Sequence, residues 1–240
     1  MLIVALDFKP MTGGVAEYTH QIALHLQLSG DNVVVLSKNT DGDKEFDSTC
    51  PYTVIRYDYD RHLKSGVVPL CRASYKAIKG VIRERQIDAV ISNNLQIAHI
   101  FWLASKLRSI PFCIFTHGTE VNRRVALGKD FRQVIEFFNE GIKRLFVLKR
   151  ADKVFCNSSF TRRVVENLGV SYNKTAILHP GIPSACLNSN SSVVKSDLDT
   201  ATRKLQFDNK KVILTLGRVI ERKGIDLVIR AMQIVREKVP

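Results

Sequence analysis

Residues 1–15 are MLIVALDFKPMTGGV, an apolar run followed by a proline-containing turn and a pair of glycines. The run at residues 2–7 is short and bounded by turn-forming residues, which predicts a buried β-strand. No basic segment or small-residue cleavage motif precedes the turn, so the run does not have the form of a signal peptide. A helical pattern begins near Val15, and the stretch therefore predicts a strand–turn–helix unit.

Gly13 and Gly14 are candidate ligand-binding residues at this turn. Glycines let a ligand approach the backbone, and the first turn of the following helix offers free N–H groups to an anion. The stretch lacks the GxGxxG spacing, so it does not predict a dinucleotide site. A plain turn is the alternative.

The same alternation of short apolar runs and longer helical stretches continues to residue 180. It is typical of βα units joined into a parallel sheet, and we expect a Rossmann-like α/β domain over residues 1–180. The expected strands are residues 2–7, 32–37, 53–57, 88–92, 111–116, 153–156 and 175–179, and the expected helices are residues 15–28, 69–86, 95–108, 130–150 and 159–167.

A breaker cluster at residues 179–183 and a Ser- and Asn-rich stretch interrupt this pattern. We expect residues 181–240 to hold a crossover linker and the incomplete start of a second α/β domain. Its expected elements are a helix at 197–206, a strand at 211–216 and a helix at 223–238. One βα unit cannot cover both faces of a sheet, so further chain is needed to complete that domain.

His117 directly follows the apolar run at 111–116, and Gly118 follows it in turn. The carboxyl ends of the strands in an open α/β sheet face the ligand crevice, which favours a functional histidine here. A structural histidine is the alternative.

A second candidate segment is residues 217–224, between an expected strand and an expected helix. Arg218 and Lys223 could converge on a diphosphate, the arginine as a planar fork and the lysine as a point charge. A solvated basic loop is the alternative.

Together these segments resemble the retaining glycosyltransferases of family 4, which have the two-domain GT-B fold. The resemblance rests on the order and spacing of loose motifs: Gly13-Gly14, His117-Gly118-Thr119-Glu120, Ala151-Asp152-Lys153-Val154 with Asn157-Ser158-Ser159, Leu178-His179-Pro180-Gly181-Ile182, Gly217-Arg218 and Lys223-Gly224-Ile225-Asp226.

The resemblance implies transfer of a hexose from a UDP- or GDP-sugar to a glycan or lipid-linked acceptor, with retention of configuration and without a bound metal or other cofactor. Arg218 and Lys223 would hold the donor diphosphate, and His117 would be the catalytic-site residue near the transferred sugar. Gly13 and Gly14 would line the cleft. Glu120 and Asn157 are weaker assignments, with an orienting or structural role.

The family's acidic E-x7-E motif, which contacts the donor sugar, lies further along the second domain than residue 240. We therefore expect a truncated chain that is inefficient alone. The alternative is a non-catalytic binding or scaffold subunit, or one half of a split glycosyltransferase whose missing half a partner chain would supply.

The net charge of +13 favours anionic partners, but Lys and Arg are spread along the chain and no nucleic-acid-binding motif is present, so nucleic acid is not an expected partner. The helix expected at 130–150 is amphipathic and basic, which suits peripheral contact with an anionic membrane; packing of its apolar face on the sheet is the alternative. The five scattered cysteines predict neither a disulfide framework nor a zinc site. We expect a cytoplasmic protein, located in part at the inner face of the membrane.

Two acidic stretches, residues 41–43 and 58–60, have the DxD form of a metal-binding motif. Because Asp and Gly also favour turns, we predict turns at both places. No phosphate-binding GxxxxGK[ST] or hydrolase GxSxG motif occurs.

Overall fold

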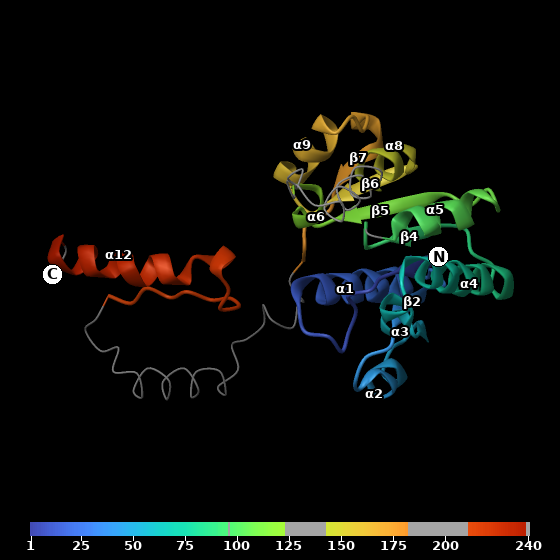
Figure 1. The fold of residues 1–240 in the computed structure, drawn as a ribbon, viewed down its shortest axis with the longest axis horizontal. Coiled ribbons are helices and arrows are strands. Elements are labelled where there is room, and N and C mark those ends of the chain that lie inside the picture. The colour runs from blue at the N-terminus through green and yellow to red at the C-terminus, as the bar shows by residue number, and fades with distance from the viewer. Residues whose placement is uncertain (96, 123–142, 182–210, 239–240) are drawn as a thin grey trace. The chain divides into compact units, whose positions relative to one another are not determined.

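The computed structural model describes residues 1–95, 97–122, 143–181 and 211–238 (Figure 1). The chain divides into two compact units, residues 1–181 and 182–240. Each unit is described by itself below.

The first unit is built on a seven-stranded parallel sheet with the order β3-β2-β1-β4-β5-β6-β7. This confirms the predicted Rossmann-like α/β fold and all seven strands predicted before residue 180. The strands are β1 (Leu2–Val4), β2 (Val34–Lys38), β3 (Thr53–Tyr57), β4 (Val90–Ser92), β5 (Phe112–Thr116), β6 (Lys153–Cys156) and β7 (Thr175–Ile177).

Four of the predicted helices are confirmed as α1 (Gly14–Leu28), α4 (Val67–Glu84), α5 (Ala98–Lys106) and α9 (Ser159–Asn167). The helix predicted at 130–150 lies outside the described residues up to 142, and its remainder is helical as η1 (Lys143–Val147) and α8 (Leu148–Arg150). The helix predicted at 197–206 lies wholly outside them. The other short helices are α2 (Asp43–Ser48), α3 (Tyr59–Lys64), α6 (Thr119–Asn122) and η2 (Tyr172–Lys174), and the second unit contains η3 (Glu221–Lys223) and α12 (Ile225–Lys238).

Two predictions of local structure are wrong. The turn predicted at 58–60 is the start of α3, where the Asp58 side chain accepts a hydrogen bond from the Arg61 amide, because aspartate caps a helix as readily as it forms a turn. The strand predicted at 211–216 pairs with no strand in the part of the chain that the structure describes, and a strand needs a neighbour to bond its backbone. Of the turn predicted at 41–43, residues 41–42 form a turn and Asp43 is the first residue of α2.

Side chains alternate between two cores along each central strand. In β1, Leu2 and Val4 join one cluster while Ile3 joins the other, and Phe112 and Ile114 of β5 lie in the first cluster. Helices α4 and α5 cover that first cluster, and α1 covers the second. A parallel sheet needs helices on both faces, which the βα order of the sequence supplies.

The segment at 143–150 packs part of its apolar face on the sheet, as one of the two interpretations of its amphipathic pattern predicts. Val147 and Leu148 are fully buried in the first cluster, as packing on the sheet requires. Phe146 is 37% exposed, and the Arg150 guanidinium lies 3.6 Å from the centre of its ring. The described part of this helix therefore packs inward and still presents an apolar and basic outer surface.

We predict that Ile114→Ala lowers the free energy of unfolding of the full chain by about 2–5 kcal/mol, because Ile114 of β5 is fully buried and its truncation leaves a cavity in the core. Leu28→Ala, at the exposed end of α1, is the control and should change it by less than about 0.5 kcal/mol. Urea unfolding followed by circular dichroism measures both. Equal losses in the two variants would contradict the assignment of β5 to the core.

Candidate functional site

The candidate site lies at the carboxyl edge of the sheet. Strands β4, β5 and β6 end at Ser92, Thr116 and Cys156, and the next residues are Asn93, His117 and Asn157. Parallel pairing in register brings these strand ends to one edge of the sheet. Three polar side chains that are distant in sequence thereby become neighbours.

The His117 ring belongs to a chain of hydrogen bonds that ends at the backbone of α1. Thr19 Oγ1 donates to the Val15 carbonyl at 2.8 Å. Its single proton is thereby used, so it accepts from Asn93 Nδ2. The Asn93 side chain then presents Oδ1 to His117 Nε2, 2.6 Å away. Because this oxygen only accepts, His117 Nε2 carries the ring proton.

Burial lowers the pKa of His117 below its ordinary value of 6.5, and the negative charges of Glu120 and Asp7 oppose this effect only in part. The imidazole is therefore neutral at pH 7. With the proton on Nε2, Nδ1 carries a lone pair that can accept a hydrogen bond.

The backbone of His117 is held from both sides. Glu120 Oε1 accepts from the His117 amide at 2.5 Å, and Asn157 Nδ2 donates to the His117 carbonyl at 3.0 Å. The next residue, Gly118, has φ +96°, and a β-carbon there would lie 3.0 Å from Thr161 Oγ1. Only glycine fits this turn without strain, so the histidine position is set by backbone contacts as well as by its ring.

The predicted glycine turn lies at the start of α1. Gly13 is the residue before the helix, with φ +155°, and no side chain caps the helix N-terminus. A β-carbon at Gly13 or Gly14 would meet nothing within 4 Å, so the space above these residues is open. An uncapped helix start with open approach is suited to an anion.

Tyr18 joins the helix start, the histidine and the crossover segment. Its ring packs edge-on against His117 with 5.6 Å between centroids, and its hydroxyl donates to the Leu178 carbonyl at 2.7 Å. His179 Nδ1 lies 3.1 Å from the Asn157 carbonyl oxygen. The segment that leads out of the first unit is thus anchored to the candidate site.

Arg218 and Lys223 lie in the second unit, on one exposed loop. The Ile220 amide donates to the Arg218 carbonyl and the Lys223 amide to the Ile220 carbonyl, both at 2.9 Å. Gly224 closes the loop with φ +62° before α12. The Lys223 side chain lies beside Gly217, where a β-carbon would be 3.9 Å from it, an ordinary van der Waals contact.

Five of the predicted site residues lie in the first unit: His117, Glu120, Asn157, Gly13 and Gly14. Hydrogen bonds join Glu120 and Asn157 to the backbone of His117. Sequence reasoning missed Asn93, Thr19 and Tyr18, which position the histidine. Asn93 carried the same signal as His117, since it directly follows an apolar strand. In the described ranges, no group of three or more His, Cys, Asp or Glu residues is arranged to hold a metal ion, and no helix is long and apolar enough to cross a membrane.

Comparison with known proteins identifies the family. The sequence model described as Glycosyltransferase Family 4 matches residues 12–185. The chain belongs to this family. The matched range includes the Gly13-Gly14 turn, His117 at the end of β5 and Asn157 at the end of β6.

A curated relative is the GDP-mannose-dependent monoacylated alpha-(1-6)-phosphatidylinositol monomannoside mannosyltransferase of Corynebacterium glutamicum, which is 25% identical over 96% of this chain. A glycosyltransferase from Rickettsia africae is a similar solved structure, with 19% identity over 98% of the chain and a TM-score of 0.70. Anabaena HepE in complex with UDP-glucose matches 97% of the chain at 17% identity and a TM-score of 0.66. These structures share the fold, in which the parallel sheet is the N-terminal half of a GT-B enzyme.

The chain spans only part of its relatives. It covers 56% of the Corynebacterium protein and 57% of each of the two solved chains. The activity of the longer proteins is therefore carried to this chain only as a proposal.

We predict that NMR will find His117 in the neutral, Nε2-protonated form at pH 7, with a pKa below 6.5. Asn93→Ala removes the acceptor and should give a mixture of the two tautomers, whereas Asn93→Asp places a carboxylate beside the ring and should raise the pKa of His117. Long-range proton–nitrogen spectra from about pH 5 to pH 8 measure both properties. A proton on Nδ1 of wild-type His117 would contradict the hydrogen-bond directions given above.

Proposed function

We propose that the chain is the acceptor-side domain and the start of the donor-side domain of a retaining glycosyltransferase. The completed enzyme moves a hexose from a UDP- or GDP-sugar to a glycan or lipid-linked acceptor. The observation that carries this proposal is a neutral histidine, fixed by the Asn93 chain at the carboxyl edge of a family 4 sheet, beside an uncapped helix start.

In this proposal His117 orients the reacting sugar. Its Nδ1 lone pair accepts a hydrogen bond from a sugar hydroxyl, and its ring stays uncharged because protonation is disfavoured by burial. Glu120 and Asn157 keep the backbone of His117 in place and do not touch substrate. The Gly13-Gly14 turn lets an anionic group of the donor or the acceptor approach the first amides of α1.

Arg218 and Lys223 bind the donor diphosphate in the same scheme. As the bond from the sugar to the diphosphate breaks, negative charge develops on the leaving group, and two fixed cations stabilise it. Positive side chains and helix amides thus supply the electrostatic stabilisation, and the proposed transfer uses no metal ion.

The donor and acceptor classes are proposed from the relatives. The Corynebacterium protein is named for GDP-mannose and a phosphatidylinositol mannoside, and HepE was solved with UDP-glucose. A lipid-linked acceptor agrees with the outer surface near Phe146 and Arg150. We place the reaction in the cytoplasm, at the inner face of an anionic membrane.

A second candidate function is that of a binding or scaffold subunit, or one half of a split enzyme. No residue described between 211 and 238 is buried. Leu214, Leu216 and Val219 are 82%, 92% and 86% exposed, which is more apolar surface than a finished domain leaves in water. Additional chain, either continuous with this one or from a partner, is expected to cover these side chains.

We predict that the chain becomes an active transferase when its second domain is completed, for example by fusion to the remaining part of the Corynebacterium protein. Arg218→Ala and Lys223→Ala should each lower kcat by about 100-fold or more, because each removes charge from the leaving-group site. Transfer of labelled sugar from GDP-mannose and from UDP-glucose to a mannosylated inositol lipid is the assay. Arg230→Ala, on the exposed side of α12, is the charge-matched control. Undiminished transfer by both variants would rule out the diphosphate assignment.

We further predict that the separately expressed remainder of the second domain binds this chain. Burial of Leu214 and Leu216 should drive the association, so the double change Leu214→Ser, Leu216→Ser should weaken it by tenfold or more, on the order of 1.4 kcal/mol. Size-exclusion chromatography and hydrogen exchange over residues 211–238 measure the complex. Leu28→Ser is the control, since Leu28 is an exposed leucine of the first unit. No complex, or one that both variants weaken equally, would count against the split-enzyme and scaffold proposals.

A further inference from the structure

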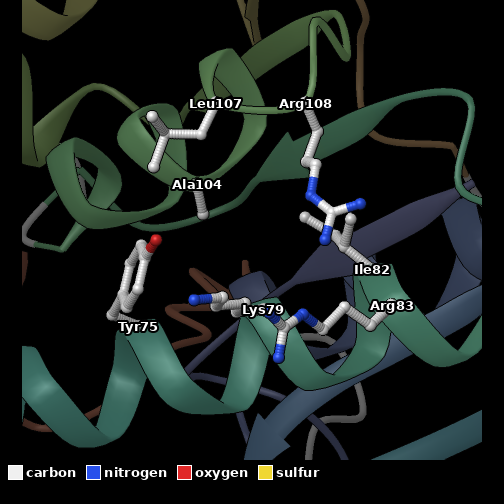
Figure 2. A pocket seen from close by; sticks show the side chains of 7 residues that line it. All are labelled: Tyr75, Lys79, Ile82, Arg83, Ala104, Leu107 and Arg108. Atoms are coloured by element: carbon white, nitrogen blue, oxygen red, sulfur yellow. The ribbon is translucent and has the colours of Figure 1, made fainter.

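A cavity of about 250 Å³ opens between α4 and α5, in the first unit. Figure 2 shows the side chains that surround it: Arg108 extends toward α4, while Lys79 and Arg83 lie along α4. The residues used below are Tyr75, Lys79, Ile82, Arg83, Ala104 and Arg108.

The geometry of α4 places three of its polar residues on one face. Tyr75, Lys79 and Arg83 follow one another at intervals of four, so their side chains lie one above the other along the helix. Arg108 comes from the turn directly after α5 and extends toward α4 (Figure 2). The buried Ile82 forms part of the floor. Two separate elements therefore present their positive charges to one space.

Three cationic residues line the cavity, and none of its lining residues carries a carboxylate. Within the ranges that the structure describes, the ion pairs engage other cations, such as Lys38, Arg56 and Lys106, and none engages Lys79, Arg83 or Arg108. The Lys79 ammonium lies 5.5 Å from the centre of the Tyr75 ring, which orients it toward the cavity wall. Lys79 is partly buried, whereas Arg83 and Arg108 are exposed. A bound anion would offset the repulsion among these like charges.

Helix polarity accounts for only part of this arrangement. Arg83 lies in the last turn of α4 and Arg108 follows the end of α5, and cations are favourable at both positions. Lys79 is more than one turn away from the end of α4 at Glu84, beyond the range of that effect. The helix dipole therefore does not explain why Lys79 lines the same cavity as Arg83 and Arg108.

The cavity is distinct from the candidate site. Helix α4 ends before β4 begins and α5 ends before β5 begins, so both helix ends lie at the amino edge of the sheet. His117 follows the carboxyl end of β5. The two locations are on opposite edges of the same sheet.

We propose that this cavity binds the phosphate group of an anionic ligand. Arg83 and Arg108 offer planar forks to the phosphate oxygens, Lys79 adds a point charge, and the Tyr75 hydroxyl can donate a further hydrogen bond. The volume is below the range of about 300–1,000 Å³ that is usual for drug-sized ligands, so the cavity takes a phosphate with few attached atoms and not a nucleotide sugar. The phosphate is that of a small phosphorylated compound or of a lipid headgroup. This inference does not depend on the proposed transferase function.

The test compares two variants of the full chain that carry the same net charge. Arg83→Gln with Arg108→Gln alters the cavity, and Arg61→Gln with Arg163→Gln alters two exposed arginines on α3 and α9. Inorganic phosphate is the probe, titrated by calorimetry against chloride at equal ionic strength. We expect wild type and the control to bind phosphate alike, and the cavity variant to bind at least tenfold more weakly. Lys79→Met, which retains both arginines, should also weaken binding.

Binding that falls equally in the cavity and control variants would reduce the effect to the net charge of the chain and overturn the proposal. Undetectable phosphate binding by wild type would overturn it as well. Near-ultraviolet circular dichroism verifies that each variant retains its packing.

Vesicles distinguish the two sources of phosphate. The probes are phosphatidylcholine vesicles with and without phosphatidic acid, in flotation assays with the same variants. Loss of phosphatidic-acid binding in the cavity variant alone would assign the cavity to a lipid headgroup. Calorimetric phosphate binding, together with vesicle binding that is the same in both variants, would assign it to a soluble phosphate compound.

Discussion

Parallel pairing of β1, β4 and β5 is the constraint on which the candidate site depends. A parallel sheet must be covered on both faces, which commits every strand to two apolar surfaces and leaves only its ends for polar chemistry. Asn93 and His117 are adjacent because their strands end in register, although 24 positions separate them in sequence. A shift of one residue in β4 would turn Val90 and Ile91 to the opposite cores and carry Asn93 away from the ring. The same hydrophobic contacts that stabilise the sheet therefore fix the chemistry at its edge.

The hydrogen bonds of the site join helices α1 and α6 to the residues that follow β4, β5 and β6. One chain leads from the His117 ring through Asn93 and Thr19 to the backbone of α1. A second pair of contacts holds the amide and the carbonyl of His117. The glycine turn at the start of α1 and the histidine are thereby coupled, so a ligand that touches both meets groups in a defined geometry. Tyr18 extends the coupling to Leu178, in the segment that leads out of the first unit.

The sequence predicted those parts of the fold that depend on local pattern. Each apolar run of the first unit became a strand, and the histidine was found because it directly follows one of those runs. Asn93 was missed, although it has the same relation to its strand, because an asparagine after a strand is also an ordinary turn residue. Its role depends on a hydrogen-bond partner 74 positions away, Thr19, and no local pattern reports such a pairing. The turn predicted at Asp58 was wrong for a related reason, because an aspartate side chain can stabilise either a turn or a helix N-terminus.

In the second unit, local pattern predicted an element that the described residues do not form. Residues 211–216 have the apolar, β-branched composition of a buried strand, yet Leu214 and Leu216 are exposed and the segment pairs with no strand among the described residues. Strand propensity expresses fit to a packed surface that includes a partner strand, and the described residues of this unit contain no such partner. Helix α12 forms in the same unit because all of its backbone hydrogen bonds are internal. The contrast between these two neighbouring segments agrees with the proposal that additional chain covers the exposed leucines Leu214 and Leu216.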